Sequence, residues 1–272
     1  MNQSVKCVVY SFLLGGLLAL IAQAILAAWN VALDGTALTA WKGAFTLMSM
    51  GVLGCILGGF GVYQFLGDKA PFGSYLPFSG FAMACGMKAV NPWTKGESVW
   101  NCLKPLLWLV LWFNMLGLVV CAAFGFAMTT AGIIPHQSVQ AAAPAILFPN
   151  AFVMGGILCA FFEICWQILS KVWKGAKHVH ILFFAWCCGA IIAPFGLSLD
   201  LIAQFGEGFA VMIPVGGHNM YMVGMELAEG NLAGAIGHLS TFFGAVGGLA
   251  VTACFTWIIY NAKFGRQSMV ET

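Results

Sequence analysis

Long apolar runs dominate the pattern of hydrophobic and polar positions along the chain. A helix that crosses a bilayer needs about 20 consecutive apolar residues. Six runs meet that need, at approximately residues 7–29, 44–66, 104–131, 148–170, 179–199 and 233–261. They predict an all-α integral membrane protein with about six transmembrane helices.

Two further apolar stretches, residues 74–87 and 209–225, are shorter and interrupted. Each contains a proline that is soon followed by glycine, at Pro77–Gly80 and at Pro214–Gly217. Non-helical backbone at membrane depth is tolerated only where protein or a water-filled cavity satisfies its hydrogen bonds. We therefore expect two re-entrant, broken helical segments that lie buried between the spans.

The clusters of basic residues fall on one side of the membrane if the six runs cross it and the two broken segments do not. The connections at residues 132–146 and 199–232 contain no lysine or arginine. By the positive-inside rule, the basic side is cytoplasmic. We therefore expect a multi-pass protein of the inner cell membrane with both termini in the cytoplasm. The basic residues concerned are Lys6, Lys88, Lys95, Lys104, Lys171, Lys174, Lys177, Lys263 and Arg266.

The two halves of the chain resemble each other. Residues 12–18 match residues 152–158, and Pro77–Gly80 falls opposite Pro214–Gly217. Three crossings in each half would place the second half upside down, and inverted repeats with broken helices are a transporter architecture. A chance similarity between glycine-rich apolar sequences is the alternative. The predicted membrane repeats are residues 1–140 and 141–272.

Composition agrees with a membrane protein, since 61% of the residues are hydrophobic and only 7% are charged. Soluble domains carry about 25% charged residues. The net charge of +2 is too small to indicate a nucleic-acid partner, so membrane lipids are the expected surroundings. The sequence contains no set of residues with the spacing of a metal site, a cofactor site or a catalytic site. We therefore expect no metal, no cofactor and no enzyme activity.

The broken segments are the first candidates for a binding site. A helix that begins inside the membrane presents free N–H groups and the positive end of its dipole, which favour a carboxylate or another anion. Proline is suited to the first turn of such a helix, glycine permits close approach of a ligand, and polar side chains add donors. Loops that only pack helices together are the alternative. The predicted substrate-binding residues are Pro77, Ser79, Gly80, Pro214, Gly216, Gly217, His218 and Asn219.

Glu163 is an acidic residue well inside the fourth apolar run. A carboxylate costs about 2.5 kcal/mol or more at that depth, so it should face the protein interior or a cavity. Burial favours its neutral form, which makes Glu163 a candidate proton carrier. Gln23 occupies the matching position in the first half. A hydrogen-bonded structural glutamate is the alternative.

The first half also resembles a known family. Residues 15–23, Gly-Gly-Leu-Leu-Ala-Leu-Ile-Ala-Gln, are similar to the start of the AC and AE subunits of stage V sporulation protein A (SpoVA). Residues 58–64 and 72–81 are similar to the glycine-rich span and the Pro-x-Thr-Gly-Phe-Gly segment of those subunits, with Ser79 in place of threonine and Ala82 in place of the second glycine. The second half resembles the same pattern more weakly, so the chain looks like a duplicated version. The resemblance implies movement of dipicolinic acid, with calcium, across the inner spore membrane.

The leading hypothesis is a transporter or channel for a small organic anion, dipicolinate-like or another carboxylate, which binds near the midplane between the two broken helices. The alternative is a non-catalytic scaffold subunit of a larger membrane complex. Other membrane subunits or further copies of the same chain are the expected protein partners.

Overall fold

The computed structural model describes residues 2–94 and 96–264 and confirms an all-α architecture. Within the described residues no β-strand forms, and the extended backbone pairs at one isolated bridge. The helices are α1 (Gln3–Ala32), α2 (Lys42–Gly59), α3 (Val62–Lys69), α4 (Pro71–Tyr75), α5 (Phe78–Thr94), α6 (Val99–Thr130), α7 (Pro144–Val172), α8 (His178–Ile192), α9 (Leu197–Phe205), α10 (Ile213–Ala228) and α11 (Leu232–Phe264). Three 3-10 turns accompany them, η1 (Thr39–Trp41), η2 (Ala193–Phe195) and η3 (Glu207–Val211).

The predicted spans correspond to helices. Four helical segments of the described residues are long and apolar enough to cross a membrane, namely Gln3–Ala32, Val99–Thr130, Pro144–Val172 and His178–Phe195. Two further apolar helices, Lys42–Gly58 and Leu232–Gly248, are shorter by the same measure. The chain is therefore a multi-pass membrane protein.

Two of the predicted spans end earlier than their apolar runs. The helix expected at 44–66 stops at Gly59, and the helix expected at 179–199 stops at Ile192. Gly61 (φ 77°) and Gly196 (φ 72°) adopt the left-handed conformation just beyond these ends. Glycine enters that region without steric cost, so the chain turns there and begins α3 and α9. The apolar runs continue through both turns, which is why hydropathy placed these two ends wrongly.

Helices α1 and α7 cross at paired glycines near the centre of the molecule. A Cβ at Gly16 would lie 2.6 Å from the carbonyl oxygen of Phe152, and a Cβ at Gly156 would lie 2.8 Å from that of Phe12. The Phe12 and Phe152 rings meet edge to face, with centroids 5.9 Å apart. Small residues permit close packing of membrane helices. Gly16 and Gly156 thus make reciprocal contacts at this crossing.

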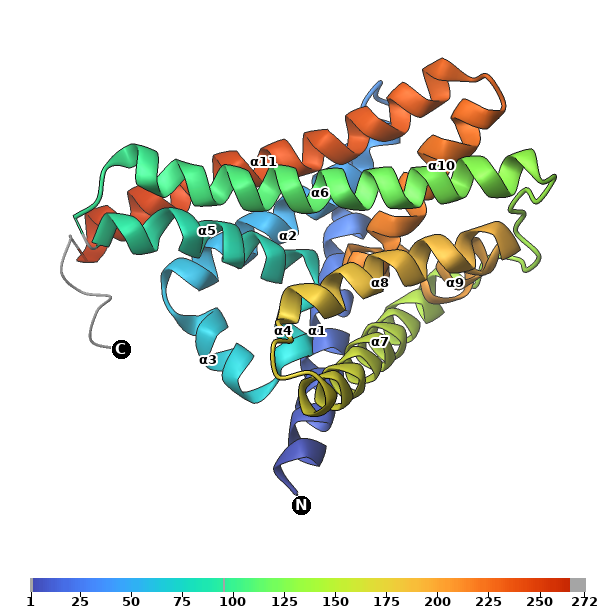
Figure 1. The fold of residues 1–272 in the computed structure, drawn as a ribbon. Coiled ribbons are helices and arrows are strands. Elements are labelled where there is room, and N and C mark those ends of the chain that lie inside the picture. Colours follow the sequence, from blue (N-terminus) through green and yellow to red (C-terminus); the bar gives the residue numbers. More distant parts are fainter. Residues whose placement is uncertain (1, 95, 265–272) are drawn as a thin grey trace.

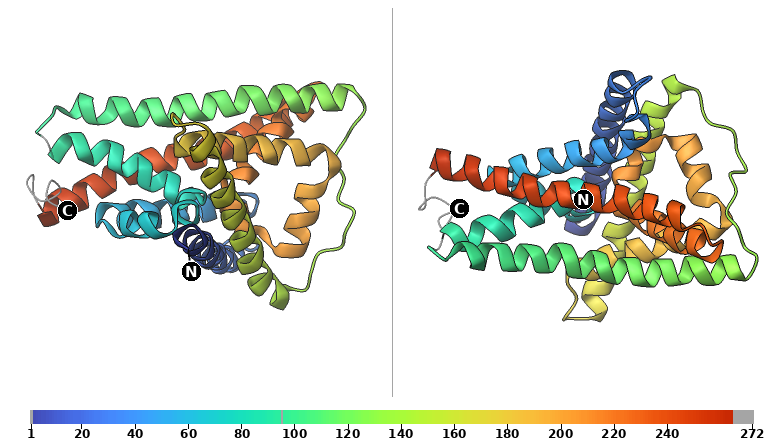
Figure 2. Two further views of the ribbon diagram at one scale, coloured as in Figure 1. Left: turned by 60° about the horizontal axis from the view of Figure 1, so that its bottom comes forward. Right: turned by 90° about the horizontal axis from the view of Figure 1, so that it is seen from above.

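The order of elements recurs along the chain (Figure 1). A long helix, a shorter helix, a glycine turn, two short elements, a half-length helix and a final long helix occur once before residue 131 and once after residue 143. The half-length helices α5 and α10 point to opposite ends of the molecule, and each packs against α6 and α11 (Figure 2).

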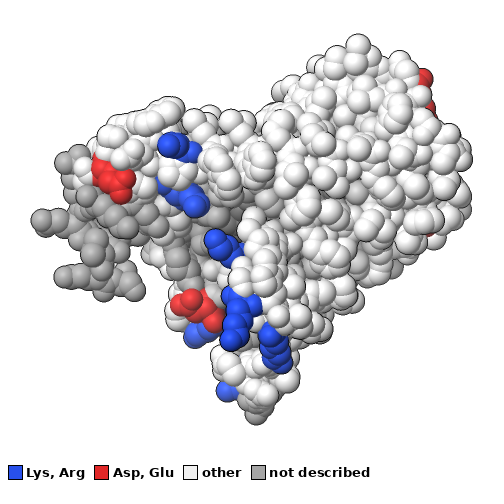
Figure 3. Space-filling model, in the orientation of Figure 1, with Lys and Arg blue, Asp and Glu red and all other residues white. Residues whose placement is uncertain are grey.

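Basic side chains gather at one end of the molecule (Figure 3). Figure 3 shows them along the left and lower left, near the start of α1 and the end of α7, with some acidic side chains among them, whereas the side chains at the upper right are acidic only. Lys42 instead lies 3.9 Å from the Glu207 carboxylate. Lys6 lies in the first turns of α1, Lys69 ends α3, and Lys171 lies in the last turn of α7. Lys95 and Arg266 lie outside the described residues.

Candidate functional site

The two broken segments meet where α5 and α10 begin. Pro77 and Met212 form an antiparallel bridge, and the N–H of Ile213 donates to the carbonyl of Leu76 at 3.1 Å. α5 begins one residue after Pro77, and α10 begins one residue after Met212. The starts of both half-length helices are therefore held together by backbone contacts.

Glycines in α2 and α8 hold these helix starts in place. A Cβ at Gly54 would lie 2.0 Å from the carbonyl oxygen of Ser79, and a Cβ at Gly189 would lie 1.7 Å from that of Pro214. Any larger residue would push the first turn of the half-length helix away. By these contacts, Ser79 in the first half occupies the position that Pro214 occupies in the second half. The sequence match aligned Pro77 with Pro214 instead. The structural register thus differs from the sequence match by two residues.

A narrow cavity of about 40 Å³ lies beside the bridge, enough for roughly three water molecules. Aromatic rings form much of its wall. Phe113 packs against Phe81 with centroids 5.7 Å apart, and Trp186 packs against Phe113 and Phe242 at 5.5 Å each. Phe78 also lines the cavity, and Asn114 and Asn219 supply amide groups. The wall is suited to an apolar, flat molecule with a few polar groups.

Gly216 and Asn219 are the two predicted binding residues that line this cavity. A Cβ at Gly216 would lie 3.1 Å from the Trp186 ring, so the wall is already tight at that point. Both residues belong to the first two turns of α10. The second broken segment therefore contributes more of the predicted site than the first.

Ser79 and His218 are buried and bind neighbouring helices. The Ser79 hydroxyl forms a short hydrogen bond with the Tyr63 hydroxyl of α3, and His218 Nδ1 lies 2.8 Å from Ser198 Oγ of α9. Tyr63 and Ser198 each lie two residues after the left-handed glycine that starts their helix. These hydrogen bonds fix the half-length helices to the short helices that precede them.

Gly80 and Gly217 pack against protein backbone. A Cβ at Gly80 would lie 1.9 Å from the carbonyl oxygen of Ser74, and one at Gly217 would lie 1.8 Å from that of Trp186. Pro77 and Pro214 are both buried at the helix starts. In this conformation these residues shape the backbone around the cavity.

Sequence reasoning missed Asn114 and the aromatic wall. Asn114 is 2% exposed and lies in the middle of α6, where its Nδ2 donates to the carbonyl of Val110. A polar residue within an apolar span is a signal for an inward-facing site, so Asn114 could have been found. Phe113, Trp186 and Phe242 carry no such signal, because apolar residues line cavities and lipid contacts alike.

Glu163 lies away from the cavity and binds α4, which leads into the first broken segment. It is 2% exposed, and its Oε2 accepts from the N–H of Phe72 in α4 at 3.3 Å and from the Ser11 hydroxyl at 3.5 Å. Its Oε1 accepts from Gln167 Nε2 at 2.9 Å. The carboxylate therefore connects α7 to α1 and α4.

Gln23 makes the matching contact on the other side of the molecule. Its Oε1 accepts from the N–H of Gly208 in η3 at 2.7 Å. Gln23 also lines a second cavity of about 280 Å³, together with Asn30, Gln137 and Glu207. Gln23 in α1 thus binds η3, which leads into the second broken segment, just as Glu163 in α7 binds α4, which leads into the first.

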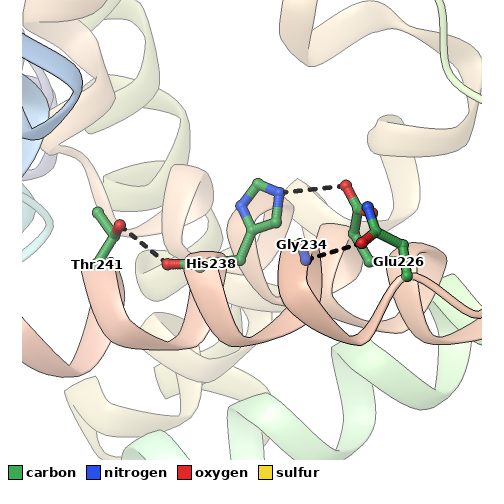
Figure 4. Close-up of polar contacts among 6 residues, drawn as sticks. Glu226, Gly234, His238 and Thr241 are labelled. Atoms are coloured by element: carbon green, nitrogen blue, oxygen red, sulfur yellow. Dashed lines mark hydrogen bonds and ion pairs between the residues drawn. The ribbon is translucent and has the colours of Figure 1, made fainter.

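The turn between α10 and α11 fixes the far end of α10 (Figure 4). The Glu226 carboxylate lies 3.7 Å from His238 Nε2 and accepts from Asn231 Nδ2 at 2.6 Å. Asn231 Oδ1 in turn accepts from the N–H of Gly234 at 3.0 Å. α10 is therefore held at its start by the bridge and at its end by this polar turn.

The connection between α6 and α7 is hydrogen-bonded to α9. Asp200 accepts from the N–H groups of Ser138 at 2.7 Å and Val139 at 3.2 Å, and from the Ser138 hydroxyl. The N–H of Ala142 donates to the carbonyl of Ala203 at 2.8 Å. These hydrogen bonds, led by the one from the Ser138 hydroxyl, hold the pKa of Asp200 below its usual range.

Removing the Asp200 carboxylate is expected to release residues 136–142. In Asp200→Ala, hydrogen exchange of these amides should be faster than in the wild type. A lowered pKa means that the contact is present at neutral pH and is lost only as the pH falls through that lowered value, below about 3.9. The protection of these amides in the wild type, corrected for the intrinsic pH dependence of exchange, should therefore be constant between about pH 8 and 5. Glu229→Ala, which removes another exposed acidic residue, is the control, and equal exchange in both variants would contradict this role.

The first half of the chain is similar to a known protein family. Residues 7–134 match the model of the SpoVAC/SpoVAEB sporulation membrane protein family, which confirms the resemblance in the first half. None of the curated proteins and none of the solved structures matches the chain. The matched region includes Gln23, the first broken segment and α6.

Proposed function

Because residues 7–134 belong to the SpoVAC/SpoVAEB sporulation membrane protein family, we propose that this membrane protein transports a small organic anion. The family description names sporulation membrane proteins, and no enzyme activity is part of it. The proposed substrate is a small carboxylate, either dipicolinate-like or another carboxylate.

One observation carries the proposal. Two half-length helices begin beside each other, within an apolar helical bundle, at a cavity with an aromatic wall and two amide side chains. Discontinuous helices whose N-termini face a site near the midplane are typical of transporters that bind anions. The aromatic wall favours a flat ring, and the positive helix ends favour its carboxylates.

The size of the cavity favours a moving carrier over a permanently open channel. About 40 Å³ holds roughly three water molecules, which is too little for an aromatic dicarboxylate. The bridge between Pro77 and Met212 lies at the same place. We therefore infer that this conformation is occluded and that the broken segments separate during transport.

We also propose that the two halves are inverted repeats and that the lysine-rich end faces the cytoplasm. The recurring element order, the left-handed Gly61 and Gly196, and the contacts of Gly54 and Gly189 support the duplication. The accumulation of lysines at one end supports the orientation. Substrate would then move between the outer side and the cytoplasm as each half opens in turn.

Glu163 is the proposed site of proton coupling. It is a buried carboxylate that touches both α1 and α4, the short helix that leads into the first broken segment. Protonation removes one acceptor from this contact, so it would weaken the attachment of α4 to α7. Gln23 cannot carry a proton in the matching contact, and any coupling would therefore act on one half only.

Uptake by the purified protein in liposomes tests the proposed function. The wild type should take up dipicolinate and other small carboxylates, and Gly216→Val should abolish this uptake because the valine fills the cavity beside Trp186. Gly43→Val is the matched control, because a Cβ at Gly43 meets nothing within 4 Å. Absence of uptake of every carboxylate by the intact wild type, with co-purifying membrane subunits, would overturn the proposal in favour of a scaffold.

A further inference from the structure

Helix α6 carries an exposed aromatic groove that the proposed transport site does not use. Trp100 is 63% exposed, Trp108 is 63% exposed and Trp112 is 56% exposed. Residues four apart lie on one helix face, so these side chains line up along α6. Trp108 and Trp112 stack with centroids 6.2 Å apart and an interplanar angle of 23°. The groove is shallow and open, and the described residues that line it all belong to α6, namely Trp100, Lys104, Leu107, Trp108, Leu111, Trp112 and Met115.

Charge is confined to one end of this groove. Among the described residues that line it, Lys104 is the charged one; it lies in the second turn of α6 and belongs to the basic residues expected on the cytoplasmic side. A lysine in such a position lays its apolar stem along the groove and keeps its ammonium group at the membrane surface. The deeper part of the groove, from Leu107 to Met115, is lined by apolar and aromatic residues.

The length of the groove matches one leaflet of a bilayer. Met115 lies eleven residues beyond Lys104, which corresponds to about 17 Å along a helix. The hydrocarbon core of a bilayer is about 30 Å thick, so on a helix that runs along the membrane normal the groove would reach roughly to the midplane. A cation at the surface and an apolar groove one leaflet deep complement a molecule with an anionic head and a long acyl chain.

The residues of the groove are unsuited to a partner helix. Membrane helices associate closely through glycine, alanine, serine and threonine, and the described residues that line the groove include none of these. Tryptophan at a membrane surface usually marks the headgroup region, yet Trp112 lies about 12 Å deeper than Lys104 along the helix. A flexible acyl chain can follow two stacked indole rings at that depth, whereas a rigid helix would be held away by them.

We infer that this groove binds one anionic phospholipid from the lysine-rich leaflet, with its phosphate at Lys104 and an acyl chain along Trp108, Trp112 and Met115. Lysines near a membrane surface attract anionic lipids. The stacked indoles add a shaped apolar wall that a plain lysine at the surface lacks. The site is separate from the cavity between the broken segments and does not depend on the transported substrate.

Tryptophan fluorescence in liposomes of phosphatidylcholine tests this site. Brominated acyl chains quench tryptophan on contact, so brominated phosphatidylglycerol and brominated phosphatidylcholine are compared at equal mole fractions. In the wild type, the anionic lipid should quench at about fivefold lower mole fraction, the effect expected of one lysine near the surface. Trp108→Phe combined with Trp112→Phe should remove most of this difference, because these residues report on the groove.

Lys104→Gln should abolish the preference for the anionic lipid, whereas Lys88→Gln, at another exposed lysine, should leave it intact. An excess of inorganic phosphate should not compete, because the acyl chain contributes to binding. Equal quenching by the two lipids in the wild type would overturn the site. An equal loss of preference in both lysine variants would also overturn it. The same holds if neither lipid quenches and the protein instead forms dimers that can be cross-linked through α6.

Discussion

Replacement of Gly54 by alanine is expected to destabilise the protein and to abolish transport. The new Cβ would lie 2.0 Å from the carbonyl oxygen of Ser79, and backbone on both sides leaves no flexible group to move. Overpacking of a tight contact costs about 1–3 kcal/mol, occasionally more. Gly189→Ala should behave in the same way, since its Cβ would lie 1.7 Å from the carbonyl oxygen of Pro214. Unfolding of the detergent-solubilised protein measures the loss.

Gly43→Ala is the matched control, because Gly43 and Gly54 lie on the same helix, α2. A Cβ at Gly43 meets nothing within 4 Å. Alanine is favoured over glycine in a helix by about 0.5–1 kcal/mol, so this control should be slightly more stable than the wild type. The changes in stability caused by Gly54→Ala and Gly43→Ala are therefore expected to have opposite signs. Similar stability of Gly54→Ala and Gly43→Ala would contradict the close contact between α2 and the start of α5.

Removal of the Glu163 carboxylate is expected to have the second large effect. Glu163→Ala takes this acceptor from the buried N–H of Phe72 and from the buried Ser11 hydroxyl, and each unsatisfied buried group costs about 1–3 kcal/mol. The Gln167 amide still donates to the carbonyl of Ser4. The variant should unfold more easily and transport poorly. Glu163→Gln keeps one oxygen for the N–H of Phe72, so its loss of stability should be smaller.

The pH dependence of uptake separates coupling from a structural role. If Glu163 carries the proton, Glu163→Gln should still take up carboxylate down its own gradient but should no longer respond to a pH gradient. Gln23→Ala serves as the control, because it breaks the matching contact with Gly208 without removing a titratable group. A wild-type response to the pH gradient in Glu163→Gln would show that Glu163 is only structural.

The membrane character and the broken segments followed from the sequence because both depend on local patterns. Apolar length predicts helices, and a proline followed by glycine predicts an interruption, as Pro77 and Pro214 do. The ends of α2 and α8 were missed because Gly61 and Gly196 turn the chain inside continuous apolar runs. A glycine in such a run is compatible with helix packing or with a left-handed turn, and tertiary contacts decide between them.

The wall of the cavity could not be predicted because it is built from residues that are distant in sequence. Phe81, Phe113, Trp186 and Phe242 come from four different helices and look like ordinary core or lipid-facing residues. The register of the second broken segment relative to the first also could not be predicted from the sequence. The prolines suggested one alignment, whereas the bridge from Pro77 to Met212 follows from contacts with Gly54 and Gly189.

A cross-link between positions 77 and 212 tests the central claim most directly. Opposite residues of an antiparallel pair lie about 4.5–5.5 Å apart between Cα atoms, which is within the range for a disulfide. The double variant Pro77→Cys, Met212→Cys should therefore form a disulfide on oxidation, with the parent protein as the control for its ten native cysteines. Carboxylate uptake in liposomes should stop in the oxidised protein and return on reduction. Undiminished uptake by the fully cross-linked protein would contradict the claim that the two broken segments separate to let substrate pass.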